Sequence, residues 1–158
     1  MAPLSILKYA HELFAFFYVA ALLAAHWNVL AVRRTKEWGE RAVLLEQNQR
    51  LSVFFSLGPL IGTGIVGNLL AAQSGYRMAE TRSLQVATAL WLVLVILGAA
   101  IEIPTSARLA ALARSASKGP GAEPVGWNSS LTRWRIGNAL QLAVFLGLLW
   151  IMIAPWRV

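Results

Sequence analysis

The sequence contains no cysteine and no aspartate, and few of its residues carry a charge. Without cysteine there is no disulfide, no thiolate nucleophile and no cysteine-ligated metal or iron–sulfur cluster. Only 13% of the 158 residues are charged, whereas about a quarter are charged in soluble domains. The sequence also lacks an HExxH pair, a nucleophile–base pattern and a phosphate loop. These absences argue against a hydrolase or a kinase, and we do not expect an enzyme.

What the sequence does contain is long apolar stretches, since 58% of its residues are hydrophobic. Four stretches, at about residues 8–32, 51–72, 84–103 and 136–153, are candidates for membrane spans. A hydrocarbon core of about 30 Å needs roughly 20 helical residues. Continuous apolar runs exclude the alternating pattern of a β-barrel, and short connections make consecutive helices antiparallel neighbours. The sequence therefore predicts an all-α fold, with residues 1–158 forming a single up-down-up-down bundle of four transmembrane helices.

The basic residues predict how this bundle is oriented. The net charge is +7, and two connecting segments hold ten of the 14 basic residues, namely Arg33, Arg34, Lys36, Arg41 and Arg50, and Arg108, Arg114, Lys118, Arg133 and Arg135. The opposite side has Lys8, Arg77, Arg82 and Arg157. Because basic loops face the cytoplasm, we expect a multi-pass protein of the plasma (bacterial inner) membrane with both termini outside the cytoplasm. This topology accounts for the positive charge, so nucleic acid is not an expected partner.

The connecting segments and the prolines predict where helices end. Trp38, Ala42 and Leu45 recur at helical spacing, which favours a short surface helix within the first basic segment. The segment 115–130 is rich in Ser, Gly and Pro and is predicted to be a loop. Pro59 is expected to kink the second span, and Pro104 to end the third. Tryptophans are expected near the membrane interfaces, with Trp27, Trp38, Trp127 and Trp134 on the cytoplasmic side and Trp150 and Trp156 on the outer side.

Small residues recur along the second span. The glycines are Gly58, Gly62, Gly64 and Gly67. The run from Gly62 to Gly67 matches G-x-G-x-x-G, but that fingerprint binds a dinucleotide only between a strand and a helix. Inside an apolar span, small residues allow another helix to approach closely. We therefore expect these glycines to pack helices together, and other membrane subunits are expected partners beside the lipid bilayer.

Polar side chains within the spans are few and are candidates for function. They are His11, Glu12, His26, Asn28, Asn68, Glu102, Asn138 and Gln141. Alternating helix directions place His26, Glu102 and Asn138 in an inner layer, whereas His11, Glu12, Asn68 and Met152 fall in an outer layer. A His26–Glu102 pair could relay protons. The alternative is an interhelical polar contact worth about 1 kcal/mol, with Glu102 reaching toward water near its helix end.

Haem is the one cofactor that the residues allow. His11 and His26 are 15 residues apart, about 22 Å along one helix, so they cannot ligate one iron within the chain. His11 alone, or His11 with Met152 on the neighbouring fourth span, could hold haem b. A copper site is not expected, because only Met78 and Met152 remain after the first methionine.

Short motifs along nearly the whole chain resemble a bacterial family of four-helix integral membrane proteins of unknown function, akin to the copper-resistance protein D type membrane domain. The matching residues are Leu7-Lys8-Tyr9-Ala10-His11, Thr63-Gly64, Pro104 with Arg108, and the ending from Arg133-Trp134 through Asn138 to Met152-Ile153-Ala154-Pro155. The same outline is similar to the membrane-bound protoporphyrinogen oxidase family. That resemblance implies a haem-associated role for His11.

Three functional hypotheses follow from the sequence. The first is a non-catalytic accessory or structural subunit that packs in a larger membrane complex through its glycine-lined second helix. The second is a haem-associated membrane redox protein that uses His11. The third is a transporter or proton path through the layer that contains His26 and Glu102.

Overall fold

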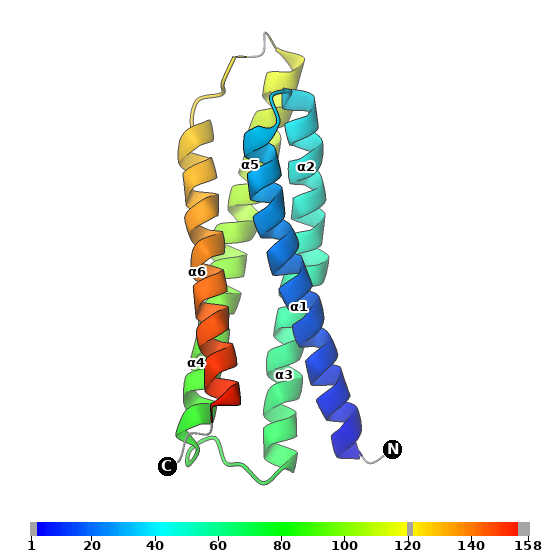
Figure 1. The fold of residues 1–158 in the computed structure, drawn as a ribbon, viewed down its shortest axis with the longest axis vertical. Coiled ribbons are helices and arrows are strands. Elements are labelled where there is room, and N and C mark those ends of the chain that lie inside the picture. The colour runs from blue at the N-terminus through cyan, green and yellow to red at the C-terminus, as the bar shows by residue number, and fades with distance from the viewer. Residues whose placement is uncertain (1–2, 120–121, 155–158) are drawn as a thin grey trace.

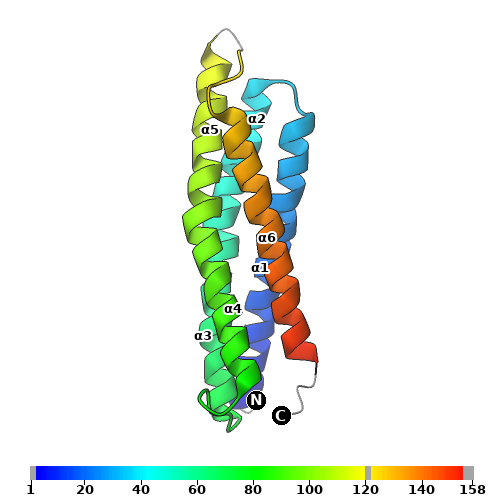
Figure 2. The ribbon, with the colours of Figure 1, turned by 90° about the vertical axis from the view of Figure 1, so that its left-hand side faces the viewer.

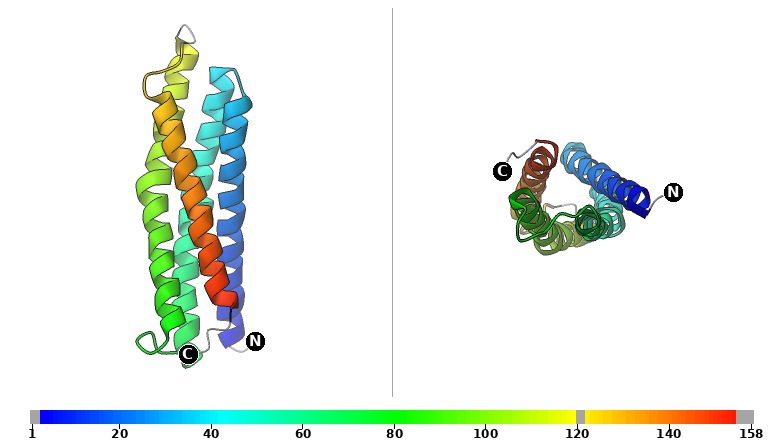
Figure 3. Two further views of the ribbon diagram at one scale, coloured as in Figure 1. Left: turned by 60° about the vertical axis from the view of Figure 1, so that its left-hand side comes forward. Right: turned by 90° about the horizontal axis from the view of Figure 1, so that it is seen from below.

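The chain folds into a bundle of four long helices that run alternately up and down (Figure 1). A computed structural model describes residues 3–119 and 122–154, and these residues contain no β-strand. Each of the four helices is long and apolar enough to cross a membrane. Seen from one end, they form a ring in which each helix contacts its two neighbours (Figure 3). The predicted all-α four-helix membrane bundle is confirmed.

Two of the four helices contain a π-helical segment. The first helix is α1 (Pro3–Arg34) and the fourth is α6 (Trp127–Ile153). The second consists of α2 (Trp38–Leu51), η1 (Ser52–Leu57) and α3 (Gly58–Gln73). The third consists of α4 (Arg82–Leu97), η2 (Gly98–Glu102) and α5 (Ile103–Lys118). Figure 2 shows that α4 and α5, like α2 and α3, form continuous rods.

Both π-helical segments directly precede a proline, and this changes where the helices end. Pro59 lies in the first turn of α3 and Pro104 in the first turn of α5, each two residues after a π-helical segment. In a π-helical turn a carbonyl bonds to the N–H five residues ahead, so the missing N–H of the proline need not interrupt the helix. The helix therefore continues past Pro104 to Lys118, and the expectation that the third helix ends at the proline is wrong. Likewise, the predicted surface helix is not separate, because α2 continues through η1 into α3. The predicted loop 115–130 is shorter at both ends than expected.

The helices extend beyond the zone in which large apolar side chains are exposed on the surface of the bundle, which we call the apolar belt. Exposed large apolar side chains on the second and third helices lie mainly from Val53 to Tyr76 and from Val86 to Ile96. By contrast, α2 and α5 have 14 and 16 residues, so they extend about 21 and 24 Å at the helical rise of 1.5 Å per residue. We call this part of the bundle, at the upper end of Figure 1, the polar head. Both basic connecting segments lie at this end.

Two separate apolar cores lie along the bundle. The core of the polar head includes Val32, Leu45, Leu109 and the buried indole of Trp134. The core of the belt includes Tyr18, Leu22, Leu60, Leu94 and Leu148. Trp127 and Trp134 are buried in the core of the polar head, whereas the sequence predicted that both would lie at a membrane interface. Trp156 and Arg157 lie outside the described residues.

Candidate functional site

Glu102 is the centre of a buried polar layer that includes residues from all four helices. Its side chain is only 2% exposed, although it is a carboxylate in an otherwise apolar bundle. Oε1 accepts a hydrogen bond of 2.7 Å from the Ser52 hydroxyl, and Oε2 accepts one of 3.0 Å from the Gln141 side-chain amide. Ser52 begins η1 and Gln141 lies on α6, so this carboxylate links three helices. In the described part of the chain, no Lys, Arg or His forms an ion pair with Glu102.

A chain of side-chain hydrogen bonds connects Glu102 to the first helix. The Asn28 amide on α1 donates to Asn48 Oδ1 at 3.2 Å, and the Asn48 amide on α2 donates to the Ser52 oxygen at 3.5 Å. Ser52 then donates to Glu102. Asn28 is half-buried, whereas Asn48 and Ser52 are buried, so the chain runs from the side of the bundle to its interior. Every donor in it is directed toward the carboxylate.

Several polar atoms near this layer have no partner. Within the described residues, the Tyr18 hydroxyl, Gln141 Oε1 and Asn138 Oδ1 are buried and make no hydrogen bond. Asn138 lies one turn before Gln141, and its amide donates to the Trp134 carbonyl at 3.3 Å. A buried polar group without a partner costs about 1–3 kcal/mol. Such a cluster is expected where a bound proton, ion or water completes the hydrogen bonds.

His26 is not part of this layer, contrary to the pair expected from the sequence. The side chain of His26 is exposed, whereas Glu102 is buried and already bonded to Ser52 and Gln141. The two residues were matched by depth along their helices, but depth does not fix which way a helical side chain points. The alternative, in which Glu102 reaches toward water, also fails because the carboxylate is enclosed.

A second candidate site is a pocket of about 310 Å³ at the opposite end of the bundle, where α1 begins and α6 ends. Its walls come from α1, α3, α4 and α6 and are mostly apolar. His11, Asn68 and Met152, which the sequence analysis assigned to one outer layer, all line it. Glu12, the fourth member of that layer, is exposed on α1.

The orientation of His11 is fixed by the backbone of α3. Nδ1 lies 3.0 Å from the Thr63 carbonyl oxygen, and because a carbonyl only accepts, Nδ1 must carry the proton. Nε2 of a neutral ring is then an acceptor or a metal ligand, as in histidines whose other nitrogen donates to a backbone carbonyl. His11 and Met152 both line this pocket, so they are the residues that would hold a haem there. Bound haem would supply redox chemistry there.

The glycines of α3 are covered by side chains of the same molecule. A Cβ atom at position 62 would lie 3.0 Å from the Phe14 ring, and at position 67 it would lie 2.8 Å from Cε1 of His11. Position 64 is covered by Trp91, whereas nothing lies within 4 Å of position 58. The face that was expected to bind another subunit is thus occupied by helices α1 and α4.

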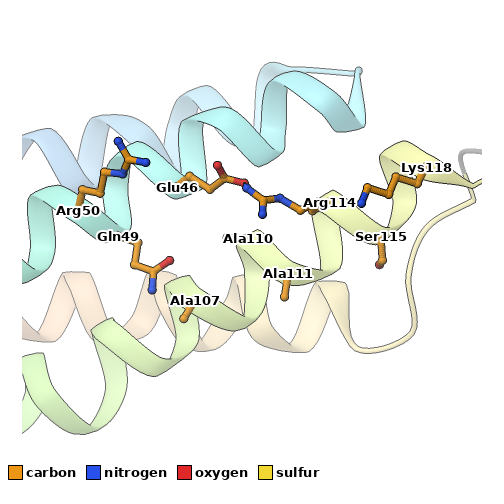
Figure 4. A pocket seen from close by; sticks show the side chains of 9 residues that line it. All are labelled: Glu46, Gln49, Arg50, Ala107, Ala110, Ala111, Arg114, Ser115 and Lys118. Atoms are coloured by element: carbon orange, nitrogen blue, oxygen red, sulfur yellow. The ribbon is translucent and has the colours of Figure 1, made fainter.

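The polar head has an open groove between α2 and α5, which Figure 4 shows with the side chains that line it. Three of these side chains are basic, namely Arg50, Arg114 and Lys118. Arg114 forms an ion pair with Glu46, and in the described part of the chain Arg50 and Lys118 have no acidic partner. The groove is therefore suited to anionic groups such as phospholipid headgroups, which basic residues near the membrane surface attract.

Sequence reasoning missed Asn48 and Ser52 of the Glu102 layer, and it also missed the buried hydroxyl of Tyr18. Asn48 and Ser52 are four residues apart and so share one helix face directly before the apolar stretch, which was a readable signal. Tyr18 gave no such signal, because a tyrosine in an apolar span is usually part of the core. The structure contains no group of three or more His, Cys, Asp or Glu residues that could hold a metal ion, within residues 3–119 and 122–154.

Comparison with known proteins does not extend these observations. No family model, no curated protein and no solved structure matches the chain. The likeness to four-helix membrane families therefore stays a prediction, and the function must be inferred from the two sites themselves.

Proposed function

We propose that the chain is a small polytopic membrane protein that takes up and releases a proton at Glu102. The observation that carries this proposal is a carboxylate with 2% exposure that has two neutral donors and no basic partner among the described residues. A buried ionisable group at membrane depth is costly and marks a proton or ion path by default. A buried charge costs several kcal/mol, so hydrogen bonds from two neutral donors do not by themselves explain why a carboxylate occupies this position.

The neighbours of Glu102 suit proton transfer. Ser52 carries a hydroxyl, which can both donate and accept a proton, and it bonds to the carboxylate from η1. The Tyr18 hydroxyl is buried and has no partner in the described part of the chain. Glu102 also ends one π-helical segment while Ser52 begins the other, and π-helical turns are frequent at functional sites.

The test is proton flux into liposomes that contain the purified protein and an enclosed pH-sensitive dye. With a potassium diffusion potential as driving force, we expect the wild-type protein to acidify the lumen and E102Q to match protein-free liposomes. E12Q is the matched control, because Glu12 is an exposed carboxylate on α1 and should leave the flux unchanged. Equal fluxes for wild type and E102Q would refute the proposal.

Two further measurements keep the result interpretable. If E102Q proves too unstable to reconstitute, S52A can be tested in its place. This variant retains the carboxylate but removes the adjacent hydroxyl, so it should lower the flux. Replacing sodium with choline should have no effect, whereas a flux that depends on sodium would assign the layer to a metal cation and not to a proton.

An accessory role in a larger complex has less support. Its motivating feature was the glycine-lined second helix, but Gly62, Gly64 and Gly67 pack against side chains of the same chain. Any partner subunit would have to dock on a different face.

A further inference from the structure

The pocket beside His11 offers hydrogen-bond acceptors, while most of its donors are already used. Three carbonyl oxygens of α3 accept hydrogen bonds from the polar side chains that line the inside of the pocket. His11 Nδ1 bonds to the Thr63 carbonyl at 3.0 Å, and the Asn68 amide donates to the Gly64 carbonyl at 2.8 Å. The Trp91 indole N–H donates to the Leu60 carbonyl at 2.7 Å. These three N–H groups are engaged, and of these side chains only the Asn68 amide keeps a second N–H.

The two hydroxyls of the inner wall are also engaged. Thr63 donates to the Pro59 carbonyl at 2.8 Å, and Thr88 directs its hydroxyl to the Met78 sulfur at 3.9 Å. The remaining hydroxyls, of Ser74 and Tyr76, belong to exposed residues at the rim.

What remains inside the pocket, apart from that second N–H, is a pair of acceptors. Asn68 Oδ1 is buried and has no partner within the described residues. When the ring is neutral, Nε2 of His11 is its unprotonated nitrogen, because Nδ1 donates to the Thr63 carbonyl. That carbonyl fixes which nitrogen carries the proton of the neutral ring, and the Gly64 carbonyl fixes which side of the Asn68 amide faces it. The remaining lining, which includes Leu70, Leu148 and Met152, is apolar.

We propose that this pocket binds a lipid-soluble molecule that carries a hydroxyl donor, of the phenol or hydroquinone class. An apolar cavity with a few oriented polar atoms is the usual form of a small-molecule site, and its volume of about 310 Å³ lies in the common range. A hydroxyl group satisfies the buried acceptor, whereas an ether or a quinone of the same shape presents only further acceptors. A site built to pair with a hydroxyl rejects analogues that lack it. This proposal is independent of proton transfer at Glu102.

The test compares three matched probes by titration calorimetry on the purified protein in detergent: an alkyl hydroquinone, its dimethyl ether and the corresponding quinone. We expect the hydroquinone to bind about tenfold more tightly than either analogue. This difference corresponds to about one hydrogen bond to a buried acceptor, which the analogues cannot form. Partition into detergent would favour the more apolar ether instead. Equal affinities for the three probes would overturn the proposal, and so would a Soret band in the protein as isolated, because haem would then occupy His11.

Variants locate the site. N68L and H11F should each reduce the preference for the hydroquinone, since each removes one of the two acceptors. H26F is the matched control, because His26 is the other histidine of the sequence and is exposed on the same helix. A loss of preference in H26F equal to that in H11F would contradict the assignment. Competition by diacylglycerol, whose hydroxyl is aliphatic, would contradict the phenol or hydroquinone class, and its failure to compete would support that class.

Discussion

The indole of Trp91 occupies the space that any side chain at Gly64 would need. A Cβ atom at position 64 would lie 2.0 Å from Cε2 of Trp91, and the indole N–H donates to the Leu60 carbonyl one turn earlier. The third helix is thus fastened to the second by a side chain inserted against bare backbone. This close approach gives the G-x-G-x-x-G match in α3 a packing role.

Replacing Gly64 should therefore destabilise the bundle. G64A forces the Trp91 ring away and breaks its hydrogen bond, and overpacking of this kind costs about 1–3 kcal/mol. G58A is the matched control, because nothing lies within 4 Å of that position and alanine favours a helix by roughly 0.5–1 kcal/mol over glycine. Unfolding in detergent, followed by circular dichroism, measures both. Equal stability of the two variants would show that Trp91 moves aside without cost.

Loss of a donor to Glu102 should be costly as well. S52A and Q141L each leave one carboxylate oxygen without a hydrogen bond in a closed site, at an expected cost of about 1–3 kcal/mol. S106A is the control, since Ser106 is equally buried but bonds only to the Ile103 carbonyl of its own helix. The same unfolding assay applies. If S106A is as damaging as S52A, the cost comes from lost packing and not from the carboxylate.

The sequence predicted the spans but not the full length of the helices. Hydropathy identifies which residues contact lipid, and it correctly found four stretches. It does not register a helix that leaves the membrane, so α2 and α5 were read as connecting segments. Pro104 reinforced that error for α5, because a proline normally interrupts a helix, whereas Pro59 was expected only to kink the second span. Here each proline lies in the first turn of an α-helix that follows a π-helical segment.

The candidate sites were predictable to different degrees. His11, Asn68 and Met152 were assigned to one layer from helix direction alone, and they do line one pocket. Glu102 was singled out, yet its expected partner was His26 and its observed partners are Ser52 and Gln141. A partner depends on the rotation of each helix about its axis, and rotation follows from packing contacts such as Gly64 with Trp91. A single sequence does not contain those contacts explicitly.

Arg41 should stabilise the polar head through its two tryptophans. Its guanidinium lies 4.4 Å from the ring centre of Trp38 and 5.5 Å from that of Trp127, while Nε donates to the Thr35 carbonyl at 2.7 Å. Each cation–π contact contributes about 0.5–2 kcal/mol. Lysine lacks the planar guanidinium that can lie over an aromatic ring and donate a hydrogen bond to a carbonyl at the same time. We expect R41K to speed amide hydrogen exchange at the start of α6.

The control for Arg41 is Arg34, an exposed arginine at the end of α1. R34K should leave exchange at the start of α6 unchanged, because a surface substitution away from such contacts alters stability by less than about 0.5 kcal/mol. Exchange in R41K that equals the wild-type rate would mean that the Trp38–Trp127 pair, with ring centres 4.9 Å apart, holds α6 without the arginine.

The absence of cysteine makes the orientation of the bundle directly measurable. We predict that the polar head faces the cytoplasm, since it holds ten basic residues and a cytoplasmic location of basic loops is the general rule. Single cysteines at Lys36 and Ser117, in or beside the head's connecting segments, should react with a membrane-impermeant maleimide only after cells are permeabilised. A cysteine at Ala79, in the exposed connection between α3 and α4 at the other end, should react in intact cells. The reverse labelling pattern would show that the bundle has the opposite orientation in the membrane. It would then place the Glu102 layer near the outer boundary of the membrane and the His11 pocket near the inner one.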